Sequence, residues 1–462
     1  MNFKHLLAGA ALMAACTAVA QQPRYIFYYI GDGMGMGPVT AAQTYNRTIL
    51  GSDKPLTMMQ FPVAGISLTY SANADITDSA AAGTALSTGN KTKNGMLGMN
   101  PDSVSVTSIA SRLHDMGYGV GVTTSVAADD ATPGAFYAHV PYRKMYYDID
   151  RQLIQSGYEF VAGAGLGGMV VDGDTTDIAS RLADAKVQLV RGPEQIASIN
   201  SERVVLLNPE GTPAYNIGYT IDSIAGVLTL PQIAETCLAH LERTSPDRFF
   251  MMVEGGNIDH ALHGNDGGAA IKEVLNFDQA LAVAYNFYLA HPDETLIIVT
   301  ADHDTGGMVH VHPRGAMGGL RNIDFQRVSK EEFSAFCKGI LRSRRMYTWE
   351  DMKEYLEENL GFYTHIKVTD QQTEDLKALF DRTFEQRNSA DQQTLYASFN
   401  EFAVEVFRIF NDATGLAFTS TGHSGNPVPV FAVGVGADEF RSLNNNTDIP
   451  AAIMRLIEES GK

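Results

Sequence analysis

The chain has 462 residues, of which 45% are hydrophobic, and its formal net charge at pH 7 is -19. This length and composition allow a large buried core in one or more domains. The negative charge excludes binding of nucleic acid through a broadly basic surface. An anionic substrate would therefore need local positive charge, which bound metal ions can provide.

The first twenty residues, 1–20, predict a signal peptide. Basic Lys4 is followed by a short apolar stretch, and small residues lead up to Ala20, where cleavage is expected. Lipid attachment at Cys16 is the less favoured alternative, because Met13 is a poor first residue for a lipoprotein site. No stretch of the chain is long and apolar enough to predict a transmembrane segment. We therefore expect an exported protein, periplasmic or secreted.

Strand and helix signals alternate along the rest of the chain. Strands are expected at Tyr25–Ile30, Val120–Thr124, Phe249–Val253, Thr295–Thr300 and Val428–Gly434. Helices are expected at 38–46, 80–86, 104–116, 230–242, 271–290 and 449–459. This alternation predicts an α/β fold with a large central, mainly parallel sheet flanked by helices on both faces. In such sheets ligands bind at the carboxyl ends of the strands.

A charge-rich helical segment interrupts this pattern. Helices are expected at 331–341, 348–360 and 373–413, and the strand pattern resumes only afterwards. We interpret 305–418 as a mostly helical insertion, and 21–304 with 419–462 as the catalytic domain. Beyond the signal peptide, Cys237 and Cys337 could form one disulfide, but two buried thiols are favoured.

The segment from Phe249 to His263 carries the first candidate metal ligands. An apolar strand ends at Glu254, two glycines follow, and Asp259 and His263 are spaced to share one face of a helix. A carboxylate and an imidazole on one helix face suit zinc. In the alternative, Asp259 caps the helix and His263 is a solvated residue.

Three further segments place ligand-type residues beside predicted strands. Asp32 follows the first strand within Gly31-Asp-Gly33, and Asp302 and His303 follow the strand that ends at Thr300. His423 lies in a glycine-rich turn just before the last strand. Each could be an ordinary turn residue, but all are predicted at one edge of the sheet.

Residues suited to an anion lie nearby in the sequence. Ser79 begins a helix of small residues, where backbone N–H groups favour an anion, although a plain N-cap serine is the common role. Asp130-Ala-Thr132-Pro133 is an oxygen-rich turn, and Arg143 could grip two phosphate oxygens.

In combination these motifs resemble the alkaline phosphatase family. The motifs are Asp32-Gly-Met-Gly, Thr77-Asp-Ser-Ala, Asp130-Ala-Thr-Pro, Glu254-Gly-x-x-Ile-Asp-x-x-x-His, Thr300-Ala-Asp-His and Gly422-His423. Six motifs in this order make a chance match very improbable. The resemblance covers most of 25–306 and then about 419 to the end, and it matches the insertion poorly.

The resemblance implies three metal sites. The first zinc would bind Asp259, His263 and His423, and the second would bind Asp32, Asp302, His303 and unprotonated Ser79. Magnesium would bind Asp32, Thr132 and Glu254, with waters completing an octahedron.

The resemblance also implies a mechanism. Ser79 would attack the phosphate monoester and form a phosphoserine, which water then hydrolyses to inorganic phosphate. Arg143 would hold the non-bridging oxygens of the substrate. Substrates would be small-molecule phosphate monoesters, and a homodimer is possible.

Two positions depart from better-known members of the family. Asp130 and His260 correspond to Asp and Lys in the enterobacterial enzyme and to two His in mammalian enzymes. Here the pair is mixed, so Asp130 would order the waters of the magnesium and His260 would reach phosphate through water. The mixture leaves open whether the third site holds magnesium or zinc.

Other histidines and other functions are weaker alternatives. His310 and His312 could share a strand face and bind an extra metal, but solvated residues are favoured. His139 is expected to be a partnered core histidine. A phosphodiesterase or phosphonate hydrolase is the nearest rival function, a sulfatase is weaker, and a metal- or phosphate-binding protein without turnover is the rival from another class.

Overall fold

The computed structural model describes residues 22–312, 319–343, 346–442 and 444–459. The predicted signal peptide, 1–20, lies outside these residues. Among the described helices, none has the length and apolar character needed to cross a membrane.

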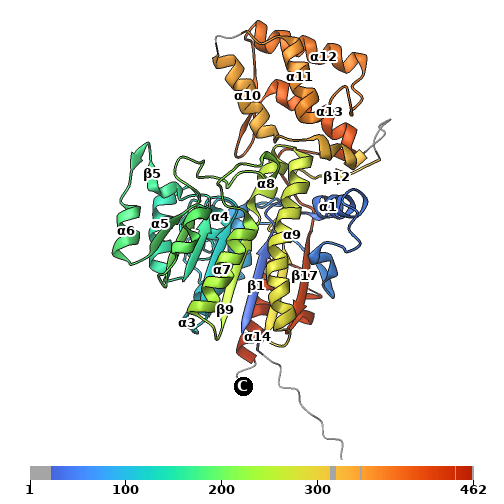
Figure 1. Cartoon of the computed structure of the whole chain (residues 1–462). Coiled ribbons are helices and arrows are strands. Elements are labelled where there is room, and N and C mark those ends of the chain that lie inside the picture. The colour runs from blue at the N-terminus through green and yellow to red at the C-terminus, as the bar shows by residue number, and fades with distance from the viewer. Residues whose placement is uncertain (1–21, 313–318, 344–345, 443, 460–462) are drawn as a thin grey trace, which may run out of the picture.

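A nine-stranded sheet organises the chain, with the order β2-β17-β10-β1-β9-β3-β4-β8-β7 (Figure 1). Neighbouring strands pair in parallel except at β17, which runs antiparallel to both β10 and β2. The prediction of a mainly parallel sheet is confirmed. In chain order the strands are β1 (Tyr25–Ile30), β2 (Val63–Ser67), β3 (Gly119–Thr124), β4 (Phe160–Gly163), β7 (Gln188–Arg191), β8 (Val204–Leu207), β9 (Phe249–Glu254), β10 (Thr295–Thr300) and β17 (Val428–Gly434).

Each face of the sheet buries its own apolar core. In β1, Phe27 and Tyr29 belong to one core, whereas Ile26 and Tyr28 belong to the other, because successive side chains of a strand point to opposite faces. Helices cover both faces, as predicted, and α7 and α9 are seen in front of the sheet (Figure 1). The first core contains α1 (Met36–Thr48), α7 (Leu230–Thr244), α8 (Gly256–His263) and α9 (Gly267–Ala290). The second contains α2 (Ser79–Thr88), α3 (Ile109–Asp115), α4 (Ala131–Gly134), α5 (Tyr146–Ser156), α6 (Ile178–Asp184) and α14 (Asp448–Glu459).

Four helices between β12 and β15 form a group of their own above α8 (Figure 1). They share an apolar core that includes Phe333, Leu356 and Phe402, separate from the two cores of the sheet. The division of the chain at 305 and 418 stays a prediction. The group comprises α10 (Lys330–Arg342), α11 (Trp349–Leu360), α12 (Asp370–Phe380), α13 (Glu401–Thr414) and the hairpin β13 (Asp391–Gln393) and β14 (Ser398–Asn400).

Short two-stranded ladders complete the structure. β11 (Asp304–Thr305) pairs with β16 (His423–Ser424), and β12 (Val309–His310) pairs with β15 (Leu416–Ala417). β5 (Val170–Val171) pairs with β6 (Asp174–Thr175) far from the helical group. The first two ladders pair the chain just after β10 with the chain just before β17, on either side of the helical group.

Two predicted helices were wrong in extent. The helix expected at 104–116 begins only at Ile109, because the Ser108 side chain accepts a hydrogen bond from Ser111 N and caps it there. The helix expected over 373–413 is interrupted by the β13–β14 hairpin. α13 begins anew after Asn400, whose side chain accepts from Phe402 N.

The structure also describes the two cysteines and the three histidines for which the sequence supports separate predictions. Cys237 and Cys337 are both buried free thiols, as favoured. His139 is only half-buried rather than a core residue, although its Nδ1 lies 2.7 Å from Gly98 O. His310 and His312 are exposed, and neither belongs to a metal-ligand group found among the described residues.

Two buried carboxyl groups, Asp129 and Asp150, contact each other behind the sheet edge. Both are fully buried, and Gly168 N donates to Asp129 Oδ2 at 3.0 Å. Burial raises the pKa of Asp129 to about 6, and burial together with Asp129 raises the pKa of Asp150 well above its usual value. The two carboxyl groups therefore resist being ionised together.

This pair predicts a pH-dependent stability. Because the folded-state pKa values are raised, their stabilising contribution is present below about pH 4 and is lost as pH rises through the folded values. In Asp150→Asn, the unfolding free energy should fall less steeply as pH rises above about 4, by up to about 1.4 kcal/mol per pH unit. Denaturant titrations at several pH values measure this slope. Asp148→Asn, on the exposed side of α5, is the control, and equal slopes in the wild type and both variants would contradict the raised pKa of the pair.

Candidate metal centre

The predicted ligands converge at the carboxyl edge of four neighbouring strands. Asp32 follows β1, Glu254 ends β9, and Asp302 with His303 follows β10. Because β17 runs antiparallel, its beginning lies at the same edge, and His423 precedes it in β16. The remaining members come from helices: Ser79 begins α2, Thr132 lies in α4, and Asp259 and His263 lie one turn apart in α8, which ends at His263.

One cluster consists of Asp32, Asp302 and His303, with Ser79 beside it. His303 Nε2 lies 3.1 Å from Asp302 Oδ2 and 3.5 Å from Asp32 Oδ1. Ser79 Oγ is 3.2 Å from the same nitrogen. Potential ligand atoms of Asp32, Asp302 and His303 all lie within 4.8 Å of one another, which is a distance that one metal ion can bridge.

A second cluster contains Asp259, His263 and His423. His263 Nε2 is 3.3 Å from Asp259 Oδ2 and 3.1 Å from His423 Nε2, and His423 Nε2 is 4.0 Å from Asp259 Oδ1. The ring of His303 stacks on His423 with centroids 3.6 Å apart. Potential ligand atoms of Asp259, His303 and His423 also lie within 4.8 Å of one another. Because His303 belongs to the first cluster as well, the two clusters adjoin.

The three imidazoles are oriented alike. Nδ1 of His263 lies 2.5 Å from Thr421 O, Nδ1 of His423 lies 2.8 Å from Thr77 O, and Nδ1 of His303 lies 3.2 Å from the Thr305 hydroxyl. A carbonyl oxygen can only accept, so Nδ1 of His263 and His423 carries a proton, and Nε2 is the ring nitrogen that faces the cluster. Second contacts of this kind are typical of histidines that bind metal.

Three buried carboxylate oxygens face these imidazoles. Asp32 Oδ1, Asp259 Oδ2 and Asp302 Oδ2 receive no hydrogen bond from any described residue. A buried oxygen without a partner is costly, and a cation at these clusters would satisfy all three. The donor set of carboxylates and imidazoles therefore fits zinc or a similar divalent metal.

Burial controls the acid–base properties of the site. It raises the pKa of Asp32 well above its usual range, that of Asp302 to about 7 and that of Glu254 to about 8. Burial also raises Asp259, but His263 and then the other histidines outweigh it and hold its pKa well below the usual value. The carboxylates need positive charge nearby to be ionised together at neutral pH.

The residues predicted for magnesium lie on the other side of Asp32. The Thr132 hydroxyl donates to Asp32 Oδ2 at 3.4 Å, and the Thr124 hydroxyl donates to Glu254 Oε2. The structure thus places Asp32 between the first cluster and Thr132. Thr124 was not predicted, because nothing separates it in the sequence from other residues of a buried strand.

Arg143 is buried and held by carboxylates. Its Nη2 donates to Asp130 Oδ1 at 2.8 Å, and its Nη1 lies 3.9 Å from Asp78 Oδ2. Asp78 also caps α2 by accepting from Ala81 N at 2.9 Å. The same carboxylate therefore fixes the helix start that carries Ser79 and balances the guanidinium.

His260 lies beside the clusters but in neither of them. Burial lowers its pKa, so the ring is neutral. Its ring packs against Tyr396, with centroids 4.0 Å apart, and Tyr396 also accepts a hydrogen bond from Arg143. Tyr396 comes from the helical group and was missed, because no motif distinguishes it from other tyrosines of that segment.

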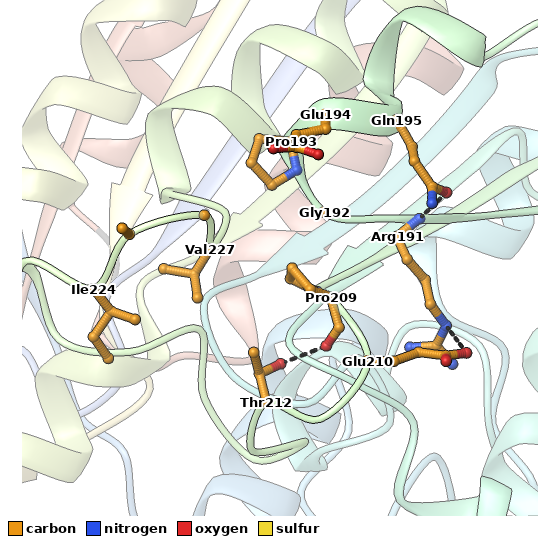
Figure 2. A pocket seen from close by; sticks show the side chains of 12 residues that line it. Arg191, Gly192, Pro193, Glu194, Gln195, Pro209, Glu210, Thr212, Ile224 and Val227 are labelled. Carbon is orange, nitrogen blue, oxygen red and sulfur yellow. Dashed lines mark hydrogen bonds and ion pairs between the residues drawn. The ribbon is translucent and has the colours of Figure 1, made fainter.

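A separate cavity of about 630 Å³ lies past the ends of β7 and β8 (Figure 2). Arg191 Nε is 3.5 Å from Glu210 Oε1 in its wall, and Thr212 donates to Pro209 O at 2.8 Å. None of the predicted site residues lines it. The chemistry of the metal-ligand clusters is therefore not shared with this cavity.

The arrangement defines a class of protein. Adjoining carboxylate–imidazole clusters, a serine at a helix N-terminus and a buried arginine at the carboxyl edge of an α/β sheet suit metal-dependent hydrolysis of phosphate esters.

Comparison with known proteins gives the same class. The sequence profile described as "Alkaline phosphatase" matches residues 24–172 and 213–458, so the chain belongs to the alkaline phosphatase family and is a phosphatase. Alkaline phosphatase 4 of Bacillus subtilis is 29% identical over 98% of this chain and 94% of its own length.

Solved structures support the fold. The cold-active alkaline phosphatase from the psychrophile Shewanella sp. has a TM-score of 0.77 and 25% identity, covering 94% of this chain and 99% of that chain. A variant of the TAB5 alkaline phosphatase, solved with Mg bound in the M3 site, has a TM-score of 0.65 and 22% identity, covering 95% and 99%. The resemblance to the family and the expected fold are confirmed.

Metal content tests the second cluster. His263→Gln removes an imidazole whose Nε2 faces the potential metal ligands Asp259 and His423. We therefore expect the loss of about one zinc ion per chain. Elemental analysis of the purified protein measures zinc and magnesium separately. His310→Gln, at an exposed histidine, should keep the wild-type content, and unchanged zinc in His263→Gln would contradict the assignment.

Proposed function

We propose that the protein is an alkaline phosphatase that hydrolyses phosphate monoesters through a phosphoserine on Ser79, with two zinc ions and one magnesium ion. The observation that carries this proposal is the position of Ser79 Oγ, 3.2 Å from His303 Nε2 at the junction of the clusters. Membership of the family supports hydrolysis of monoesters.

The metal assignment is the one that the resemblance to the alkaline phosphatase family implies. Asp259, His263 and His423 would hold the first zinc, and Asp32, Asp302 and His303 would hold the second. Asp32, Thr132 and Glu254 would hold magnesium, whose preference is for oxygen ligands. When bound, these cations would supply the positive charge that lowers the pKa of Ser79 and stabilises the attacking and leaving oxygens.

The protein's own groups position the reaction. Ser79 is 1% exposed and begins α2, so its oxygen lies where backbone N–H groups and the helix dipole favour an anion. Its oxygen would form a bond to phosphorus while the bond to the alcohol breaks, and water would later replace Ser79 at phosphorus. Arg143 would bind two non-bridging oxygens, and Asp130 holds its Nη2 in place.

Neutral His260 and Asp130 would contribute indirectly. His260 would contact phosphate through water, and Asp130 would order waters on the magnesium. Asp130 also caps α4 by accepting from Ala131 N at 2.7 Å, which fixes the turn that carries Thr132. A homodimer, and export to the periplasm or beyond, are further parts of the proposal that rest on the sequence.

Hydrolysis of p-nitrophenyl phosphate with and without a chelator tests the function. We expect activity that the chelator abolishes and that zinc with magnesium restores. The same assay with bis(p-nitrophenyl) phosphate should give a much lower kcat/KM. Faster diester hydrolysis would favour the phosphodiesterase alternative, and chelator-insensitive hydrolysis would overturn the mechanism.

The phosphoserine is tested with ³²P-labelled substrate. Ser79→Ala should form no labelled adduct after acid quenching and should lose nearly all turnover, because the oxygen that attacks phosphorus is gone. Ser87→Ala, at the other end of α2, is the matched control. A stable labelled adduct on Ser79→Ala would assign the nucleophile to another residue.

A further inference from the structure

The hairpin of the helical group brings a tyrosine into the metal centre. The turn between β13 and β14 comprises residues 394–397, and Tyr396 within it accepts a hydrogen bond from Arg143 Nη2 at 3.2 Å. Its ring centroid is 4.0 Å from that of His260 and 5.3 Å from that of His263. Tyr396 therefore extends from the second cluster to the guanidinium.

The base of the hairpin is fixed from two sides. Asn400 N donates to Ser334 Oγ at 2.8 Å, and Lys338 Nζ forms an ion pair with Asp391 Oδ2 at 3.0 Å. On the other side, Lys330 Nζ lies 4.8 Å from the ring centroid of Phe399. Lys330 itself donates to Gly264 O at 2.7 Å, directly after α8.

The turn is also braced from within. Thr394 N donates to Ala397 O at 2.9 Å, and Ala397 N donates to the Thr394 hydroxyl at 3.2 Å. Leu395, at the same tip, is 54% exposed, whereas Tyr396 points inward. These contacts hold the phenol in place without the help of a ligand.

Because Arg143 donates to Tyr396, the hydroxyl hydrogen of Tyr396 stays free to be donated to another group. A guanidinium can only donate, so Tyr396 Oη accepts from Arg143 and keeps its own hydrogen for another acceptor. Among the described residues, the contact with Arg143 is the one hydrogen bond found for the Tyr396 hydroxyl. A phosphoryl oxygen held by Arg143 would provide one.

We propose that Tyr396 is a substrate-binding residue that donates a hydrogen bond to a non-bridging oxygen of a terminal phosphoryl group and thereby selects monoesters over diesters. This inference rests on the proposed function. A monoester dianion has three oxygens that can accept, so Arg143 and Tyr396 can both be satisfied. In a diester one of these oxygens carries a second organic substituent, so only two non-bridging oxygens remain. Either Arg143 or Tyr396 then loses an oxygen that could accept its hydrogen bond.

The alternative is that Tyr396 only packs the hairpin onto His260. Tyr396→Phe separates the two roles, because it keeps the ring and removes the hydroxyl. Tyr215→Phe is the matched control, since its hydroxyl also contacts the helical group, at 2.7 Å from Glu331 Oε1, but not the metal centre.

The experiment compares these variants with the wild-type holoenzyme. For Tyr396→Phe we expect kcat/KM for p-nitrophenyl phosphate to fall about tenfold and the Ki for inorganic phosphate to rise by a similar factor. The kcat/KM for bis(p-nitrophenyl) phosphate should change by less than about twofold. The metal content and Tm of Tyr396→Phe should stay as in the wild type. Tyr215→Phe should leave kcat/KM unchanged for both esters.

Other outcomes overturn the inference. Unchanged monoester kinetics and unchanged phosphate Ki in Tyr396→Phe would leave only the packing role. An equal loss for both esters would remove the proposed selection. Tyr396→Ala gives a second measurement, because opening this side of the site should lower the ratio of monoester to diester activity further.

The two proposals can fail separately. If the wild-type protein hydrolyses no monoester, the proposed function is wrong. Calorimetric titration of zinc-loaded wild type and Tyr396→Phe with inorganic phosphate then still tests Tyr396. Equal phosphate affinity in the two proteins would refute its part in binding.

Discussion

The structure depends on the burial of four carboxylates at one edge of the central sheet. Asp32, Glu254, Asp259 and Asp302 are each at most 5% exposed and lie next to one another. Like charges so close in a dry environment repel strongly, so they cannot be ionised together without cations. The sheet creates this conflict, because parallel strands end at one edge, and bound cations would resolve it. An anionic protein can in this way present a locally positive surface to phosphate.

Backbone carbonyls are as important to the site as the ligands. Thr77 O and Thr421 O fix the rings of His423 and His263 from segments that are far apart in the sequence. Thr77 lies in the loop before α2, and Thr421 lies in the loop before β16. Both loops must therefore be in place before the two imidazoles are oriented correctly. The site is a product of the tertiary fold, and a short peptide around α8 would not reproduce its geometry.

Much of the fold could be predicted because its signals are local. The strand 25–30 is apolar throughout, as a strand buried on both faces should be, and the i,i+4 spacing of Asp259 and His263 places both on α8. The extent of the helices was harder to predict, since the cap at Ser108 and the new start at Asn400 compete with continuous helical propensity.

The site could be predicted only where a residue belongs to a motif. Asp32, Asp302 and His303 stand beside glycines or at strand ends, so their types and positions mark them. Tyr396 could not be found in this way, because it reaches Arg143 across 253 positions of sequence through a hairpin that local propensity did not reveal. Thr124 looks like any β-branched strand residue until Glu254 is placed next to it.

The two ladders at the base of the helical group have a consequence for how such proteins diversify. β11 with β16 and β12 with β15 close the segment at its neck, so its two ends are held together whatever lies between them. The entropic cost of a longer or shorter loop grows only slowly with its length. The segment can therefore vary in length while His423 keeps its position beside Asp259.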